Sequence, residues 1–132
     1  MAIQLKNYIF KAGALYDGVV SNSKMLCHIK NGVLYKGYMT SQSNAVAVVK
    51  DGKIYDGYAV RLSTLKGFAK GDVVYAGNIP RSSAIVLMKK SSDFYLGNIQ
   101  KSSAKLDPIK GAEWIDLALF AALFHYFISP IF

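Results

Sequence analysis

The side chains best suited to nucleophilic catalysis in this chain are its single cysteine and its two histidines. Cys27 and His28 are adjacent, and a thiol beside an imidazole can act as a nucleophile with its general base. The sequence around them is typical of a β-strand, however, in which neighbouring side chains point to opposite faces. We therefore expect Cys27 and His28 not to meet, and we interpret His28 and His125 as buried histidines with satisfied hydrogen bonds.

Metal, carboxylate and phosphate chemistry each need a pattern that the sequence lacks. A zinc site needs clustered Cys and His ligands, which are absent. Asp17 and Asp56 share one position of a repeat, but two carboxylates on neighbouring hairpins would meet, as in a glycosidase, only by unusual geometry. The glycines occur singly, with no glycine-rich run that opens a helix and could bind phosphate. We predict no catalytic residue, no metal site, no cofactor and no enzymatic activity.

The remaining chemistry is electrostatic, because 16 Lys and Arg against 8 acids give a net charge of +8. Such a surplus suits an anionic membrane, an acidic partner protein or nucleic acid, although lysines beside turns more often keep a sheet soluble. Nucleic acid is the least favoured partner, because no recognised module is present and the tyrosines have packing roles. The candidate basic surface consists of Lys30, Lys50, Lys70, Lys90, Arg61, Arg81 and Lys101.

A repeat of about twenty residues must position these side chains. The trio Tyr-x-Gly returns at steps of 19, 20, 20 and 20 residues, and a lysine precedes each tyrosine by five. A period of this length indicates one small structural unit copied in tandem. The repeated residues are Tyr16, Tyr35, Tyr55, Tyr75 and Tyr95, with Gly18, Gly37, Gly57, Gly77 and Gly97.

Each repeat is predicted to form a tight β-hairpin. Two β-rich runs flank Asp51-Gly52 in the clearest copy, and Asn31-Gly32 fills the same place one repeat earlier. Asn-Gly and Asp-Gly suit the two positive-φ positions of a type I′ turn, which joins paired antiparallel strands through two residues. The five copies therefore predict five hairpins in tandem.

Side-chain alternation gives each hairpin two faces. A two-residue loop places Lys50 opposite Lys53 and Val48 opposite Tyr55. One face then carries the tyrosine, the glycine and the residue seven places before the tyrosine, which reads Ile9, His28, Val48, Phe68 and Met88. The other face is apolar throughout, with Leu15, Leu34, Ile54, Val74 and Phe94. Because both faces are partly apolar, we expect the hairpins to wrap around another element or to stack closely.

The Tyr-x-Gly trio has a structural interpretation and a functional one. The tyrosine and the glycine lie on one face, where the ring could cover the bare backbone of the glycine and fix the strand register. The glycine could equally allow a neighbouring element to approach closely. The functional alternative is a repeated ligand pocket built on the tyrosines.

The last segment of the chain is predicted to be an apolar helix over residues 108–129. Pro108 suits the first turn of a helix, and Pro130 would end it. Apolar residues occupy every face of Leu117–Ile128, so this surface must be hidden. Three arrangements are open: a plug in the middle of the hairpins, a tail anchor in a membrane, or a helix-mediated oligomer. Spanning a bilayer takes ~20 apolar residues, more than this run has, which favours the plug.

Together these elements predict a single domain, 1–132, that is mostly β. Five tandem β-hairpin repeats over residues 6–105 would form a closed or flower-like ring around a hydrophobic C-terminal α-helix, 108–129. No signal peptide opens the chain, and a single cysteine rules out an internal disulfide framework. We therefore expect a cytoplasmic location, with a membrane-associated one as the alternative.

The run Val46-Ala-Val-Val-Lys-Asp-Gly-Lys-Ile-Tyr-Asp-Gly57 resembles the four-fold beta-flower proteins, small bacterial domains in which hairpins radiate around a pseudo-symmetry axis. The resemblance covers roughly residues 6–105 and implies that fold, with a fifth hairpin left as a cap or an irregular piece. It implies no established activity. The segment 51–57 also resembles part of a MORN repeat, whose hairpins share a Tyr-x-Gly core and often lie near membranes. MORN units carry further glycines in a second strand, and those are missing here.

The sequence thus predicts a non-enzymatic binding or scaffold domain that acts through one face of the hairpin ring. Its partner would be a protein or an anionic surface. The alternative is a membrane-associated protein that inserts Leu117–Ile128 and turns its basic residues toward anionic headgroups.

Overall fold

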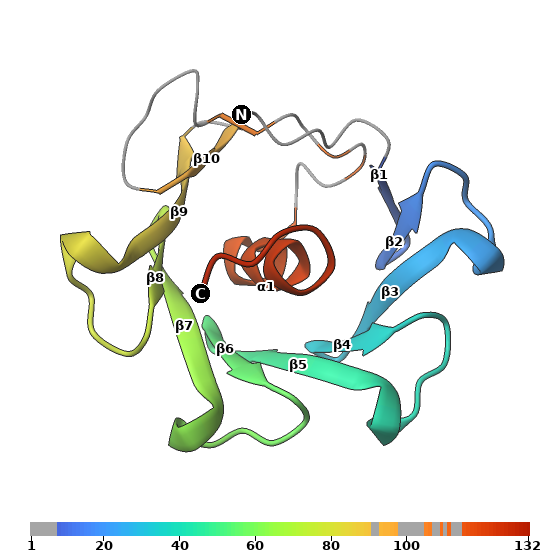
Figure 1. Ribbon diagram of the computed structural model, residues 1–132, viewed down its shortest axis with the longest axis horizontal. Coiled ribbons are helices and arrows are strands. Elements are labelled where there is room, and N and C mark those ends of the chain that lie inside the picture. Colours follow the sequence, from blue (N-terminus) through green and yellow to red (C-terminus); the bar gives the residue numbers. More distant parts are fainter. Residues whose placement is uncertain (1–7, 91–92, 98–104, 107–108, 110, 112–114) are drawn as a thin grey trace.

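The computed structural model describes residues 8–90, 93–97, 105–106, 109, 111 and 115–132 (Figure 1). Within them the chain forms β-strands followed by one α-helix, α1 (Leu117–Phe127), so it is mostly β as predicted. The strands are β1 (Tyr8–Lys11), β2 (Ala14–Asp17), β3 (Met25–Lys30), β4 (Val33–Lys36), β5 (Ala45–Lys50), β6 (Lys53–Asp56), β7 (Leu65–Lys70), β8 (Val73–Ala76), β9 (Ile85–Lys90) and β10 (Asp93–Leu96).

The strands form one antiparallel sheet, in which each strand is hydrogen-bonded to its neighbours in the sequence. The predicted register is confirmed, since Lys50 lies opposite Lys53 and Val48 opposite Tyr55. Tight turns fix this register. Asn31-Gly32 and Asp51-Gly52 each have positive φ at both positions, as a type I′ turn requires.

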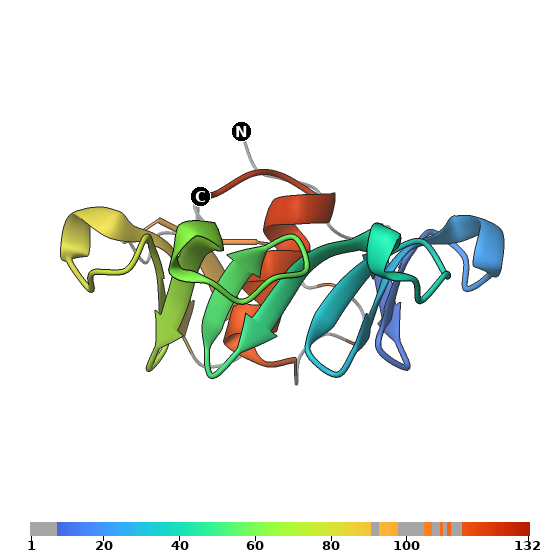
Figure 2. The ribbon, with the colours of Figure 1, turned by 90° about the horizontal axis from the view of Figure 1, so that it is seen from below.

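Neighbouring hairpins are joined with a register shift at the same place in each repeat. The shift falls just before the motif tyrosine, for example between Ile54 and Tyr55 where β6 meets β7. The pairs β2–β3, β4–β5 and β8–β9 shift in the same way. An extra residue on one strand bends the sheet and increases its twist. The repeated bend curves the sheet around α1, as Figures 1 and 2 show.

The sheet does not close into a ring. Its end strands are β1 and β10, and no pairing joins them within the described residues, so the structure does not support the predicted closed ring. The chain after β10 occupies the outer edge of that strand. Lys105 bridges Tyr95, and the Leu106 N–H donates to the Phe94 carbonyl at 2.8 Å. An edge whose hydrogen-bonding groups already have a partner is not free to pair with β1.

The uniformly apolar face of the sheet packs against α1. Four residues of the predicted column, Leu15, Leu34, Ile54 and Val74, are fully buried, and Phe94 is 6% exposed. The Phe94 ring stacks on the ring of Phe120 with 3.9 Å between centroids. The buried residues of the helix are Ala118, Phe120, Ala121, Ala122, Leu123 and Phe124. The apolar helix surface is thus hidden inside the curved sheet.

The helix is shorter than the predicted 108–129. It begins at Leu117 because the Asp116 carboxylate accepts hydrogen bonds from the Ala118 and Leu119 N–H groups at 3.2 and 3.4 Å, which caps the first turn. Gly111 has φ of 89°, which lies outside helical conformations. Pro108 lies outside the described residues. Among the residues that are described, no helix has the length and apolar character needed to cross a membrane.

The glycine of the Tyr-x-Gly trio serves backbone geometry. Gly37 and Gly57 have φ of 71° and 80°, and a Cβ added at either would meet nothing within 4 Å. Close approach of a neighbouring element is therefore the wrong explanation. The left-handed conformation turns the chain out of the strand, and the Gly57 N–H still donates to the Val46 carbonyl at 2.9 Å.

Candidate binding surface

The curved sheet has two rims, which Figure 2 shows from the side. The two-residue turns of the hairpins lie at one rim. The connections between hairpins lie at the other, each ending in a short 3₁₀ turn such as Leu62–Thr64. We call the second rim the connector rim and define it as residues 18–24, 37–44, 57–64 and 77–84. The C-terminus lies on the same side of the molecule (Figure 2).

The connector rim carries the exposed apolar side chains of the described chain. Eight large apolar residues are strongly exposed, between 45% and 74%, and all eight lie in connectors. They are Val19, Val20, Tyr38, Met39, Tyr58, Val60, Leu62 and Ile79. Exposed apolar groups that recur at one end of a molecule indicate an interaction surface.

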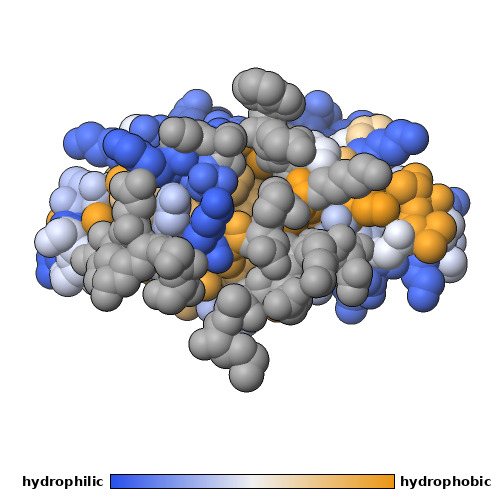
Figure 3. Space-filling view, turned by 90° about the horizontal axis from the view of Figure 1, so that it is seen from above, coloured by the Kyte–Doolittle hydropathy of each residue, from blue (hydrophilic) through white to orange (hydrophobic). Residues whose placement is uncertain are grey.

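A side view shows how apolar surface reaches the outside of the molecule. In Figure 3 apolar atoms gather over the part of the sheet that carries β1–β3, next to hydrophilic surface. The connector in this part contains Val19 and Val20, which are 61% and 45% exposed. Sequence reasoning missed this surface. The signal was present, since one or two apolar residues follow most of the motif glycines within three positions.

The candidate basic residues are split between the two rims. Lys30, Lys50, Lys70 and Lys90 end strands β3, β5, β7 and β9 beside the tight turns, whereas Arg61 and Arg81 lie in the third and fourth connectors. The structure therefore does not bring the lysines and the arginines together. Lys101 lies outside the described residues.

The motif tyrosines are distributed one to a hairpin. Tyr35 stacks on His28 at 5.2 Å between centroids, and Tyr75 stacks on Phe68 at 5.1 Å. These two rings thus pack on the residue seven places before them. Tyr16, Tyr35 and Tyr95 are 9% exposed, while Tyr55 and Tyr75 are half-buried. The tyrosines occupy equivalent places in successive hairpins and are committed to packing on strand neighbours.

Cys27 and His28 lie on opposite faces of β3. Cys27 is fully buried among the core residues, and burial raises the pKa of its thiol to about 12. His28 lies on the other face, where its Nδ1 donates to the Gly37 carbonyl at 2.7 Å and its Nε2 lies 2.9 Å from the Thr40 hydroxyl. The histidine ties the second connector to the sheet. Its hydrogen bonds are satisfied as predicted, but His28 and His125 are half-buried and not buried.

Asp56 has a structural partner. The Tyr126 hydroxyl donates to the Asp56 carboxylate at 2.7 Å and joins α1 to the end of β6. Burial, and then Asp56, raise the pKa of Tyr126 well above its ordinary value. Asp56 is thus paired with a helix residue at the edge of the core. In the part of the chain that the structure describes, no group of three or more His, Cys, Asp or Glu could hold a metal ion.

His125 fixes the last residues of the chain. Its Nδ1 accepts hydrogen bonds from the Ile131 and Phe132 N–H groups at 2.9 and 3.2 Å, so this nitrogen must be unprotonated. Burial lowers the pKa of His125, and Lys66 lowers it further while Asp56 opposes the shift. The neutral imidazole therefore holds the C-terminal tail against the sheet.

We expect the protein to lose stability as the pH falls below 6.5 because of His125. The unfolded chain binds a proton near the ordinary pKa of 6.5, whereas the folded chain binds one only at lower pH. The stabilisation by neutral His125 is complete above 6.5 and is lost as the pH falls toward the lowered folded value. Thermal unfolding between about pH 8 and pH 5.5 measures this. His125→Gln keeps an acceptor but does not titrate, so an equal pH dependence in both proteins would contradict the assignment.

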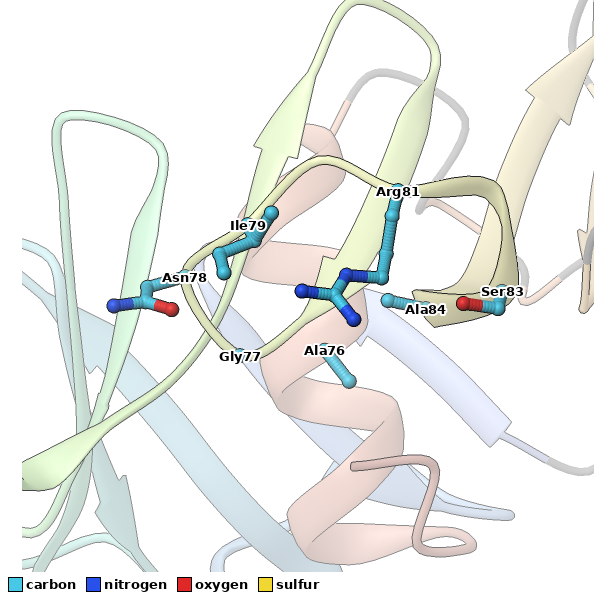
Figure 4. A pocket seen from close by; sticks show the side chains of 7 residues that line it. All are labelled: Ala76, Gly77, Asn78, Ile79, Arg81, Ser83 and Ala84. Atoms are coloured by element: carbon cyan, nitrogen blue, oxygen red, sulfur yellow. The ribbon is translucent and has the colours of Figure 1, made fainter.

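Each flank of the fourth connector borders a hollow. Figure 4 shows the first, where the Arg81 side chain points back under the loop toward Ala76. This hollow has a volume of about 360 Å³ and is also lined by Gly77 and Ser83. The second hollow lies on the other flank and has a volume of about 370 Å³. Asn78 borders both.

Comparison with known proteins gives no relative for this arrangement. The chain matches no protein-family model, no curated protein and no solved structure. The resemblance to beta-flower proteins and to MORN repeats stays a prediction.

Proposed function

We propose that this protein is a non-enzymatic binding module whose connector rim binds an anionic membrane surface. The observation that carries the proposal is the set of eight exposed apolar side chains, all on one rim. Exposure of apolar side chains to water is unfavourable, and transfer into the interfacial layer of a bilayer would remove them from water. The flower-like arrangement of hairpins is part of the proposal, because it distributes the loop tips around one rim.

The shape and composition of the rim favour a membrane over a protein partner. Its apolar residues are spread over four separate loops, which suits a broad, flat surface better than a single pocket. Tyr38 and Tyr58 are 59% and 48% exposed, and tyrosine is enriched at membrane–water interfaces. Arg61 and Arg81 lie in the same loops, and each basic residue near an anionic membrane contributes about 1 kcal/mol.

The rim also offers membrane contact without unfolding. Insertion of Leu117–Ile128 would require the buried helix side chains to leave the strands that cover them. The two largest of these side chains, Phe120 and Phe124, are 1% and 0% exposed. Because burial of a large apolar side chain is worth ~1.5–3 kcal/mol, removing the helix would expose the apolar face of the sheet at a high free-energy cost. Contact through the connectors leaves this core intact.

Replacing rim residues should weaken vesicle binding. We expect the triple variant Tyr38→Ser, Tyr58→Ser, Leu62→Ser to bind vesicles of phosphatidylcholine and phosphatidylserine at least ~10-fold more weakly, a loss of ~1.4 kcal/mol or more. Flotation of full-length protein with the vesicles measures the partition. Wild-type protein that stays wholly in the soluble fraction would argue against the proposal, as would a triple variant that floats like wild type.

A matched pair of charge variants tests which rim faces the lipid. Arg61→Ala with Arg81→Ala removes two charges from the connector rim, and Lys30→Ala with Lys50→Ala removes two from the opposite rim. The arginine variant should lose more binding to phosphatidylserine vesicles than the lysine variant. Equal losses would mean that net charge alone drives the binding.

A further inference from the structure

A second feature of the molecule lies on the outer face of the sheet, between the third and fourth connectors. A hollow of about 370 Å³ opens there, at the small end of the ~300–1,000 Å³ typical of small-molecule sites. Phe68 of β7 lines it, with Lys53 and Lys70 beside it and Leu62, Asn78 and Pro80 from the connectors. The hollow is thus apolar at one end and cationic at the other.

Strand geometry places both lysines beside the aromatic ring. Lys53 lies directly opposite Phe68 in the β6–β7 pair, and Lys70 follows Phe68 by two residues on the same face. On the other side, the Phe68 ring stacks on Tyr75 of β8 at 5.1 Å between centroids. Neither lysine forms an ion pair within the described residues. The salt bridge found there joins Lys105 and Asp93. Two unpaired ammonium groups therefore flank one fixed aromatic ring.

Comparison between repeats explains why the hollow is found here. Three residues after the motif tyrosine, the second and third repeats have Tyr38 and Tyr58, whereas the fourth has the smaller Asn78. The position of Lys53 is occupied by Val33 and Val73 in the flanking repeats. Next to the hollow, the repeat pattern thus loses one aromatic ring and gains one lysine. Formation of the hairpins requires neither change.

We infer that this hollow binds a small amphiphilic anion, which has a planar apolar body and a phosphate or carboxylate head. The head would lie between Lys53 and Lys70, where a charge-assisted hydrogen bond to each ammonium is available. The body would pack against Phe68 and Leu62, which supply apolar surface on two sides. The site goes beyond the membrane contact of the rim, because its lysines lie toward the tight turns at the other end of the hairpins.

Calorimetry with 1-naphthyl phosphate tests this inference. The probe should bind to the full-length protein at least tenfold more tightly than either 1-naphthol or inorganic phosphate, because only the probe has both parts. No detectable binding of the probe would overturn the inference. Equal binding of inorganic phosphate would overturn it too, since the aromatic floor would then have no role.

Two variants locate the site. Asn78→Tyr restores the residue that the second and third repeats carry at this position, so it should fold and should weaken probe binding at least tenfold by filling the hollow. Lys53→Met with Lys70→Met should weaken it by a similar factor. Lys11→Met with Lys30→Met removes the same charge from the first two hairpins and should leave the affinity unchanged. Probe binding that survives Asn78→Tyr undiminished would overturn the inference.

A competition experiment separates a lipid headgroup from a soluble ligand. Phosphatidic acid vesicles are added to the complex of wild-type protein and 1-naphthyl phosphate, with the rim variant Tyr38→Ser, Tyr58→Ser, which leaves the lining of the hollow intact, as a second protein. Displacement of the probe from both proteins identifies a lipid phosphate as a competent head. Retention of the probe in both identifies a soluble anion. Because the calorimetric titrations use no membrane, they can fail while vesicle binding succeeds, and the reverse.

Discussion

Replacing Phe120 by alanine should lower the free energy of unfolding by about 3–5 kcal/mol. Phe120 is 1% exposed, and its ring lies between Phe94 of β10 and Phe124 of the next helix turn, at 3.9 and 6.1 Å between centroids. Alanine would remove the apolar contact between α1 and the last hairpin and leave a cavity that the surrounding strands cannot fill. Denaturant unfolding followed by circular dichroism measures the loss.

Two further variants keep this prediction testable. Phe120→Leu retains most of the volume and should cost less than Phe120→Ala, which allows a measurement if the alanine variant does not fold. Leu62→Ala truncates a side chain that is 74% exposed and should change stability by no more than ~0.5 kcal/mol. Similar stability for Phe120→Ala and Leu62→Ala would mean that α1 does not occupy the core.

Gly67→Val should destabilise the protein by at least ~1–3 kcal/mol, the usual range for an overpacked core. A Cβ at Gly67 would lie 2.5 Å from the Phe132 ring and 2.5 Å from the Tyr75 carbonyl oxygen. The C-terminal tail, held by His125, places the Phe132 ring in the space that a side chain would otherwise take. Thermal and denaturant unfolding of the two proteins measure the difference.

Adjacent and second-site variants test the cause. Lys66→Val introduces the same side chain at the neighbouring exposed position and should be nearly neutral. Adding Phe132→Ala to Gly67→Val should recover part of the stability, because it removes the ring but not the carbonyl contact. No recovery would show that the tail does not pack on Gly67 in solution.

The hairpins and their faces could be predicted because their causes are local. Asn31-Gly32 and Asp51-Gly52 accept the positive φ of a two-residue turn, and once the turn is fixed each strand residue has one possible partner. Alternation then assigns Leu34 and Ile54 to the core. The same reasoning placed Cys27 and His28 on opposite faces.

The predictions that were wrong concern contacts that a repeat pattern does not encode. The prediction of a closed ring was wrong because Lys105 and Leu106 occupy the edge of β10. The twenty-residue repeat does not predict that these two residues pair with β10. The predicted helix was too long because the cap by Asp116 decides where helical hydrogen bonding begins. Close approach of a neighbouring element, one of the two structural explanations of the glycine of the trio, is wrong, because the positive φ of the glycine is the cause.

The sequence by itself therefore determined the repeat, the turns, the register and the apolar column, since each depends on residues within one hairpin. Only the tertiary structure decided how the hairpins are assembled. It placed α1 within the curve of the sheet, the connector loops together on one rim, and Phe132 against Gly67. These outcomes depend on the bend between hairpins and on which volumes are left to fill, and both are properties of residues that are far apart in the chain.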